Sequence, residues 1–286
     1  MWKFIRYELR YWLRTPMIWI FFFINALFTF FATASDDIII GGTSGNIFKN
    51  APYQIELYYS TMSILCLLMT TAFMNATANR DFQYGMYQFV FASPIKKRDY
   101  FFGKFIGASI ISVIPMLGLS FGTLLAPIIG PLFPKLAQAE RYGDIFWSAH
   151  LQSLLTFGLP NVIITGVLLY ALAIIFRSNI VSFIGAMLIL VFYIISGSYT
   201  QDIQKEWLAS LLDPFGMRPF DTMTKYYTVA DKNFNTHLLH GDLLMNRLIW
   251  LGISFVLLLL VYYKFSFNTK KEKAKKIDDT KTVSQP

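Results

Sequence analysis

Residues 178–201 read SNIVSFIGAMLILVFYIISGSYTQ, a run that contains no Asp, Glu, Lys or Arg. A helix needs about 20 mostly apolar residues to cross the hydrocarbon core of a bilayer, which is roughly 30 Å thick. The chain has further runs that are free of these four residue types, at 15–35, 57–79, 105–134, 145–176 and 248–263. The last run is shorter, and we expect its flanking Arg247 and Lys264 to extend to the two membrane interfaces. The sequence therefore predicts an all-α membrane protein with six transmembrane helices.

The chain divides into three parts. Residues 1–14 precede the first span, residues 15–265 form one six-span domain, and residues 266–286 form a Lys-rich tail that we expect to be disordered. The predicted spans are residues 16–34, 54–77, 103–128, 150–176, 179–199 and 246–264.

Local signals refine this arrangement. Gly118 and Gly122 in the third span form a GxxxG pair, which favours close packing against another helix. Residues 177–179 leave room for a tight turn, so the fourth and fifth spans are predicted to form an antiparallel hairpin. Residues 202–246 are too polar to span and long enough for a short helix or two.

The basic residues predict the orientation of the chain. Of the 25 Lys and Arg residues, 17 lie in the N-terminus, the segment after the second span, the turn after the fourth span and the tail, and 8 lie in the other segments. Because cytoplasmic segments carry an excess of Lys and Arg, both termini of this multi-pass protein are predicted to be cytoplasmic. The net charge of +8 then reflects topology and attraction to anionic lipid, and it requires no nucleic-acid partner.

The N-terminal segment alternates basic residues with aromatic and aliphatic ones. Trp2, Ile5, Leu9 and Trp12 have the spacing of one helix face. This pattern suits an amphipathic helix that lies in the cytoplasmic membrane interface. The alternative is a basic flank that only orients the first span. The predicted membrane-interface residues are Trp2, Lys3, Arg6, Arg10 and Arg14.

The sequence offers little catalytic or ion-coupling chemistry. Ion-coupled carriers usually need ionisable groups within the spans; here His150 is the candidate, and its position favours an interfacial histidine. The phosphate-binding motif G-x-x-x-x-G-K-[ST] and the zinc motif H-E-x-x-H are both missing. His237 and His240 are spaced like metal ligands, but no third ligand is indicated. We therefore predict no catalytic residue, no metal site and no cofactor in this chain.

The segment between the second and third spans is unusual. Residues 79–104 read NRDFQYGMYQFVFASPIKKRDYFFGK. Phe82, Met86, Phe89 and Val90 recur at helical spacing, and Ser93-Pro94 ends the pattern. A short helix with aromatic residues on all sides is not expected to remain fully exposed to water. The pattern therefore predicts that this helix docks into a groove of a partner protein. The alternative is an ordinary loop that lies on the bilayer.

This arrangement resembles the permease subunits of ATP-binding-cassette transporters of the type-2 exporter class. The matching residues are Asp81, Gly85, Ser93, Pro94, Ile95, Lys97, Tyr100, Gly103 and Lys104. Met86 stands where the family usually has Thr. The resemblance implies a coupling helix that docks on a separate ATPase subunit, which holds the ATP and magnesium. The residues implied in this contact are Asp81, Phe82, Gly85, Met86, Phe89, Val90, Ser93 and Pro94.

The last predicted outer segment adds a narrower resemblance. The motifs at 213–216, 224–228, 231–233 and 246–250 are similar to those of Bacteroidetes-type permeases, some of which carry a second permease half and a zinc aminopeptidase domain in one chain. The resemblance implies an exporter subunit that pairs with a second permease half, as a homodimer or a heterodimer. The rival hypotheses are a non-transporting membrane anchor or assembly factor and, more remotely, a membrane enzyme.

Overall fold

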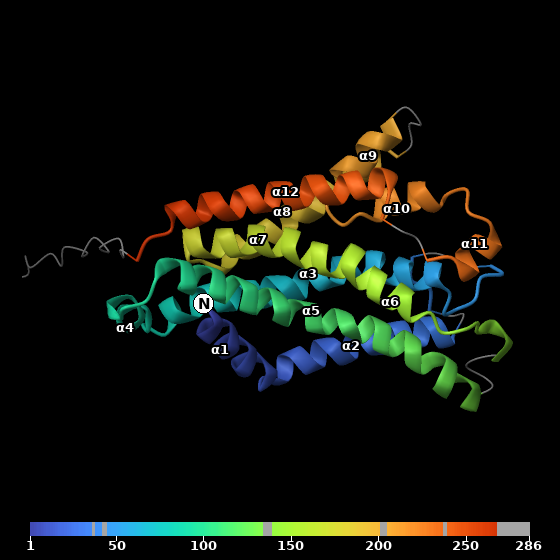
Figure 1. Ribbon diagram of the computed structural model, residues 1–286, viewed down its shortest axis with the longest axis horizontal. Helices are drawn as coiled ribbons and strands as arrows, with labels where there is room; N and C mark the ends of the chain where they lie inside the picture. The colour runs from blue at the N-terminus through green and yellow to red at the C-terminus, as the bar shows by residue number, and fades with distance from the viewer. Residues whose placement is uncertain (36–37, 42–44, 134–138, 201–204, 237–238, 268–286) are drawn as a thin grey trace, which may run out of the picture.

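The computed structural model describes residues 1–267 apart from 36–37, 42–44, 134–138, 201–204 and 237–238. Among these residues every regular element is helical. Six helical segments are long and apolar enough to cross a membrane, which confirms the predicted fold class (Figure 1). They are α2 (Pro16–Ala34), α3 (Pro52–Gln83), α5 (Lys97–Ile129) with its 3-10 extension to Leu132, α6 and α7 together (Trp147–Phe176), α8 (Asn179–Ser198) and α12 (Gly241–Lys264).

Shorter helices lie near the two ends of the bundle. At one end are α1 (Trp2–Leu13) and α4 (Tyr87–Ala92), and we call this the α4 end (Figure 1). At the opposite end, the α11 end, are α9 (Glu206–Leu212), α10 (Met217–Thr224) and α11 (Val229–Phe234). The described part of the predicted outer segment thus holds three short helices rather than one or two. The predicted disorder of the tail concerns residues that lie almost wholly outside the described ones.

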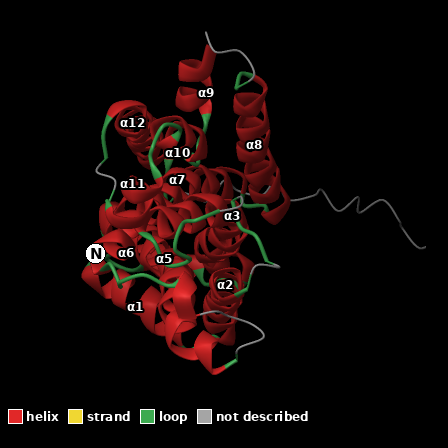
Figure 2. Ribbon diagram, turned by 90° about the vertical axis from the view of Figure 1, so that its right-hand side faces the viewer, coloured by secondary structure: helices red, strands yellow, loops and turns green. Residues whose placement is uncertain are grey.

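The helices divide into an inner and an outer set. Helices α3, α5 and the α6–α7 pair supply most of the buried core. In the most apolar stretch of α8 only 28% of the residues are buried, and in that of α12 only 22% are buried. Exposed Phe, Ile and Leu side chains cover α8 and α12, and a membrane protein turns such surfaces toward lipid or a partner helix. Figure 2 shows α8 and α12 at the periphery. Helices α7 and α8 are joined through Arg177 and Ser178, which confirms the predicted hairpin.

Helices α2 and α5 approach each other at the glycine pair, as predicted. A Cβ atom at Gly118 would meet the carbonyl oxygen of Phe22, and one at Gly122 would meet that of Ala26. Close approach also allows cross-helix hydrogen bonds. Thr29 Oγ1 donates to the Leu119 carbonyl at 3.0 Å, in a part of the bundle where water is excluded.

The Arg247 side chain turns into the bundle, so the prediction that it extends outward from the end of its helix was wrong. Its side chain is 2% exposed. Its guanidinium donates to Asn161 Oδ1 at 2.6 Å and to Asn246 Oδ1 at 2.7 Å, and it packs on Gly216, which has φ +78°. The amide acceptors offset the desolvation of the cation. Arg247, which the sequence placed at the flank of the last span, therefore links α7, α12 and the α9–α10 turn inside the bundle.

His150 was predicted to be an interfacial histidine, and the structure shows how the protein itself surrounds this residue. This side chain is buried between helices, and its Nδ1 lies 3.0 Å from Ser120 Oγ. Ser120 is in turn 2.8 Å from the Tyr59 hydroxyl. A local partner on α5 therefore satisfies the imidazole without water.

Candidate coupling site

The segment after α3 turns sharply at the α4 end. Helix α3 ends at Gln83, α4 begins at Tyr87, and Gly85 between them has φ +68°. A positive φ is available to glycine at little cost, so Gly85 fixes the position of the turn. The helical spacing of Phe82, Met86, Phe89 and Val90 predicted one short helix, and this prediction was wrong: Phe82 belongs to α3, and α4 is a separate short helix after the turn.

The turn sorts its apolar side chains into exposed and packed groups. Tyr84 is 74% exposed, Met86 50% and Phe89 72%. Figure 1 shows α4 at the extreme end of the bundle's long axis. Large apolar side chains gathered at such a tip are typical of an interaction surface.

The other aromatic residues of the segment anchor it to the bundle. The ring of Phe82 lies 5.4 Å from that of Tyr87 and 5.8 Å from that of Phe91. The guanidinium of Arg177, from the α7–α8 turn, lies 4.2 Å from the centre of the Phe82 ring. Such ring and cation contacts each contribute modestly, yet together they hold the segment against several helices.

Phe91 extends these contacts to α5 and to the residues after α12. Its ring centre lies 5.7 Å from that of Tyr100 and 4.7 Å from that of Phe267. Phe265 stacks on Tyr100 with an interplanar angle of 7°. A displacement of α4 would therefore act on α3, α5 and the end of α12 together.

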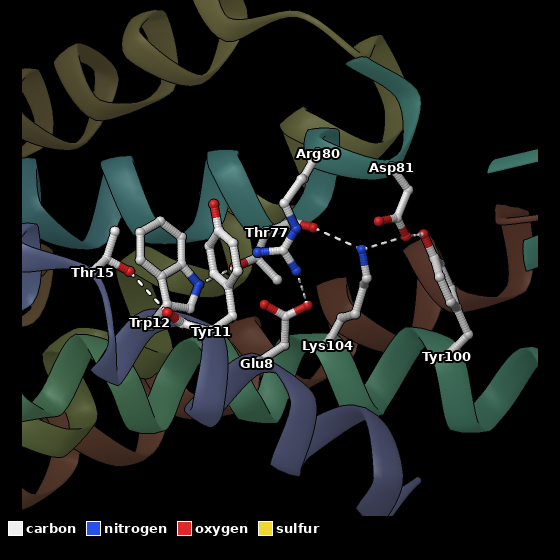
Figure 3. A network of polar contacts seen from close by, with 9 residues as sticks. All are labelled: Glu8, Tyr11, Trp12, Thr15, Thr77, Arg80, Asp81, Tyr100 and Lys104. Atoms are coloured by element: carbon white, nitrogen blue, oxygen red, sulfur yellow. Dashed lines mark hydrogen bonds and ion pairs between the residues drawn. The ribbon is translucent and has the colours of Figure 1, made fainter. Parts of the chain in front are cut away.

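A polar network continues from this cluster into the bundle (Figure 3). Asp81 Oδ2 accepts from Lys104 Nζ at 2.6 Å and from the Tyr100 hydroxyl at 2.8 Å. Lys104 also donates to the Thr77 carbonyl at 3.1 Å, and its side chain is 3% exposed. Because the ammonium is buried, its partners must come from the protein, and they tie α5 to α3.

Helix α1 joins the same network from the other side. Arg80 Nη2 donates to Glu8 Oε1 at 2.5 Å, and Trp12 Nε1 donates to Thr77 Oγ1 at 3.1 Å (Figure 3). The Glu8 side chain is fully buried. Burial raises the pKa of Glu8 above its ordinary value of 4.5, while the neighbouring cations Lys104 and Arg80 act in the opposite direction.

Two glycines of α5 let α1 come this close. A Cβ atom at Gly103 would lie 2.6 Å from Phe4 Cβ, and one at Gly107 would lie 2.7 Å from Glu8 Cβ. The glycines are four residues apart and face α1 along one stripe, as Gly118 and Gly122 face α2. Helix α5 thus uses a pair of small residues toward each of its first two neighbours.

The predicted partner-binding residues fall into different surroundings. Met86, Phe89, Ser93 and Pro94 are exposed together with Gly85. Asp81 and Phe82 point into the contacts described above, and Val90 packs on the core. Of the predicted interface residues, Trp2, Lys3, Arg6, Arg10 and Arg14 are all exposed, while the opposite face of α1 buries Ile5, Glu8 and Trp12.

Sequence reasoning missed several participants. Tyr84 is the most exposed aromatic residue of the turn, and Glu8, Arg80 and Gly107 build the junction with α1. A signal for Glu8 was present, because it is the sole acidic residue among the first 14. Nothing in the sequence named its partner, which lies 72 positions away.

The six apolar helices define the class as a multi-pass membrane protein. Residues 4–197 match the family described as ABC-2 family transporter protein, and the chain belongs to this family. It is therefore a membrane component of an ATP-binding-cassette (ABC) transporter. No curated protein matches the chain. The family match covers nearly all of α1 through nearly all of α8, and it includes the candidate coupling site except Phe265 and Phe267.

Proposed function

We propose that this chain is the permease subunit of an ATP-driven exporter and that its ATPase subunit docks on Tyr84, Met86 and Phe89. The observation that carries this proposal is the exposure of these three side chains at the tip of the α4 end. Binding hot spots in protein interfaces are usually aromatic residues that enter a pocket of the partner. The ATPase supplies the bound ATP and magnesium.

The contacts behind the turn supply a route for coupling. When the ATPase moves on hydrolysis, it displaces α4, and Phe91 transmits this to Tyr100 of α5. Asp81 links the same tyrosine to α3, and Arg80 links α3 to Glu8 of α1. The helices α1, α3 and α5 would then move as one unit relative to α8 and α12, whose faces are largely uncovered.

The remaining parts of the proposal follow from charge and exposure. The α4 end faces the cytoplasm, because it carries the N-terminus, the end of α12 and the larger share of the described basic residues. A second permease half, identical or different, covers part of the exposed helix faces and completes the pathway. The chain resides in the bacterial inner membrane, and the coupling turn distinguishes it from a non-transporting anchor or assembly factor.

The docking test replaces the two exposed aromatic rings together. Tyr84→Ala/Phe89→Ala should weaken ATPase association by about 2 kcal/mol or more, which is roughly a 30-fold rise in Kd. The measurement is binding of the purified ATPase to the permease in nanodiscs, followed by ATPase turnover in the complex. Phe82→Ala should affect turnover more than binding, because this ring anchors the segment instead of facing the partner.

A matched control comes from the opposite end. Tyr226 and Phe234 are also exposed, at 86% and 56%, and the variant Tyr226→Ala/Phe234→Ala removes the same two residue types. It should leave ATPase binding unchanged. If both double variants bind the ATPase equally well, the turn at Gly85 is not the docking surface and the coupling proposal fails.

A further inference from the structure

The exposed face of α1 carries a pocket whose lining residues make no hydrogen bond or ion pair with the coupling network among the contacts described above. The pocket is open to one side, has a volume of about 400 Å³, and is lined by Tyr7, Arg10, Tyr11, Arg14 and Thr15. Tyr7, Arg10 and Tyr11 belong to α1, and Arg14 caps its C-terminal end with helical φ and ψ angles. Their spacing of i, i+3, i+4 and i+7 places these four residues in one stripe. This stripe lies away from the face that buries Ile5 and Glu8 against the bundle.

The charge of the pocket suits an anion. Arg10 and Arg14 are exposed, with guanidinium groups that can each bind a phosphate through two parallel hydrogen bonds. Behind the tyrosines lies a third guanidinium: the Arg80 carbon centre is 4.1 Å from the Tyr11 ring and 5.4 Å from the Tyr7 ring. Arg80 Nη1 is buried and has no hydrogen-bond partner among the residues that the structure describes.

No carboxylate competes for these cations in the lining of the pocket. The acidic residue of α1, Glu8, is fully buried and already paired with Arg80. The tyrosine rings give the pocket an apolar wall as well as a positive rim. An occupant must therefore combine a negative headgroup with an apolar body, which is the chemistry of an anionic phospholipid.

The position of the pocket favours a lipid over a protein. Figure 1 shows the elbow between α1 and α2 at the side of the bundle, set back from the tip where α4 projects. Directly after the elbow, α2 exposes Trp19, Ile20 and Phe23, and Trp19 Nε1 donates to the Leu13 carbonyl at 3.1 Å. Exposed tryptophan beside basic residues marks the depth of lipid headgroups, and the apolar surface of α2 continues toward the acyl chains.

We propose that the Tyr7–Arg10–Tyr11–Arg14 stripe binds the phosphate of one anionic phospholipid, whose acyl chains lie along α2. The site holds α1 in the headgroup layer while its opposite face contacts α3 and α5. Lipid occupancy would then support the same junction, Glu8 with Arg80, that links α1 to the coupling network. The proposal does not require ATPase docking, and lipid retention is measured on the permease alone.

The experiment measures lipid that stays bound to the purified full-length chain. Protein in detergent is incubated with phosphatidylglycerol or phosphatidylcholine, washed at about 0.5 M salt to screen diffuse attraction, and examined by native mass spectrometry. Wild-type protein should retain one phosphatidylglycerol in clear preference to phosphatidylcholine. Arg10→Gln/Arg14→Gln should lower this retention about tenfold or more, because two charge-assisted contacts are lost.

The control variant removes the same charge from the same helix. Lys3 and Arg6 are exposed but do not line the pocket, so Lys3→Gln/Arg6→Gln should change retention less than about twofold. Arg10→Lys/Arg14→Lys keeps the charge and loses the planar fork, and its retention should fall between wild type and the Gln variant. A circular-dichroism spectrum and an elution volume like those of the wild type verify that each variant is folded.

Other results would overturn the proposal. Equal losses in the two Gln variants would mean general surface charge without a site. Displacement of the lipid by millimolar glycerol phosphate would mean that the pocket takes a soluble anion. Unchanged lipid retention with weaker ATPase binding in Arg10→Gln/Arg14→Gln would assign the stripe to a protein contact.

Discussion

At the scale of single residues, several buried charges among the described residues are held in pairs or by amides. Glu8 meets Arg80, Asp81 meets Lys104, and Arg247 meets the amide oxygens of two asparagines. Removing one partner of a buried ion pair leaves the other charge buried with neither water nor an opposite charge beside it. The free-energy cost of that unpaired charge is much larger than the net stabilisation that the intact pair contributes. These residues therefore govern whether the helices that they join stay together.

The pair Glu8–Arg80 gives a residue-scale prediction. Arg80→Met should destabilise the protein by about 3–5 kcal/mol at neutral pH, because the carboxylate of Glu8 stays buried without its guanidinium. Arg98→Met is the control at the same end, and since that side chain is 68% exposed it should cost less than about 0.5 kcal/mol. The measurement is thermal unfolding in detergent. An equal loss in both variants would contradict the buried-pair interpretation.

The same pair sets a direction for the pH dependence. Because the folded-state pKa of Glu8 lies above its ordinary value of 4.5, its contribution to stability is fully present below pH 4.5 and is lost as the pH rises through the folded-state pKa. Arg80 lowers that pKa, so Arg80→Met should extend the loss of stability to higher pH. Glu8→Gln should remove this part of the pH dependence, as measured by Tm between about pH 5 and pH 8.

At the scale of elements, α5 is the helix on which the first half of the chain is assembled. Gly103 and Gly107 receive α1, and Gly118 and Gly122 receive α2. Adding a methyl group at Gly122 brings Cβ against the Ala26 carbonyl and the Thr29 hydroxyl, so the two backbones must separate. Gly122→Ala should therefore cost about 1–3 kcal/mol in spite of its better helix propensity.

Gly252 in α12 provides the matched control. A Cβ atom there meets nothing within 4 Å. Gly252→Ala should thus be neutral or stabilise by up to about 1 kcal/mol, through helix propensity alone. The measurement is the free energy of unfolding of both variants in the same detergent. If Gly122→Ala is as stable as Gly252→Ala, close contact between α2 and α5 is dispensable for stability.

The helices also show which structural features could be predicted from local sequence patterns and which could not. Uncharged runs located the spans because a bilayer fixes the length and polarity of a spanning helix, and the spacing of Gly118 and Gly122 indicated a close contact. The turn at Gly85 was missed because the apolar spacing around it fits a continuous helix. Arg247 and Glu8 were misjudged or overlooked because their partners, Asn161 and Arg80, lie far along the chain. Local patterns carry no information about such pairings.

At the scale of the whole molecule, buried polar contacts concentrate toward the two ends. At the α4 end they join α1, α3 and α5, and at the α11 end Arg247 joins α7, α12 and the α9–α10 turn. Between them the core is mainly apolar, and its directional contacts include hydrogen bonds across α2 and α5, from Asn25 Nδ2 to the Pro115 carbonyl at 2.9 Å and from Thr29 Oγ1 to the Leu119 carbonyl at 3.0 Å. A movement of α4 would therefore act on α1, α3 and α5, which are hydrogen-bonded to one another at the α4 end. At the α11 end, α7, α12 and the α9–α10 turn would retain their own contacts.

The orientation of the whole molecule is the last prediction, and every proposal about its partners depends on it. Cys66, the single cysteine, is buried and is first replaced by Ala. Ser93→Cys, Tyr226→Cys and Asn235→Cys then place one thiol at the α4 end or at the α11 end, each at an exposed position. A membrane-impermeant thiol reagent added to intact cells should label the variants at 226 and 235 and spare the one at 93, because basic residues are retained in the cytoplasm.

After permeabilisation the variant at 93 should be labelled as well, which verifies that its thiol is reactive. Labelling of the Ser93→Cys variant in intact cells would place α4 outside, where no ATP-hydrolysing subunit operates, and the aromatic turn would then need a different partner.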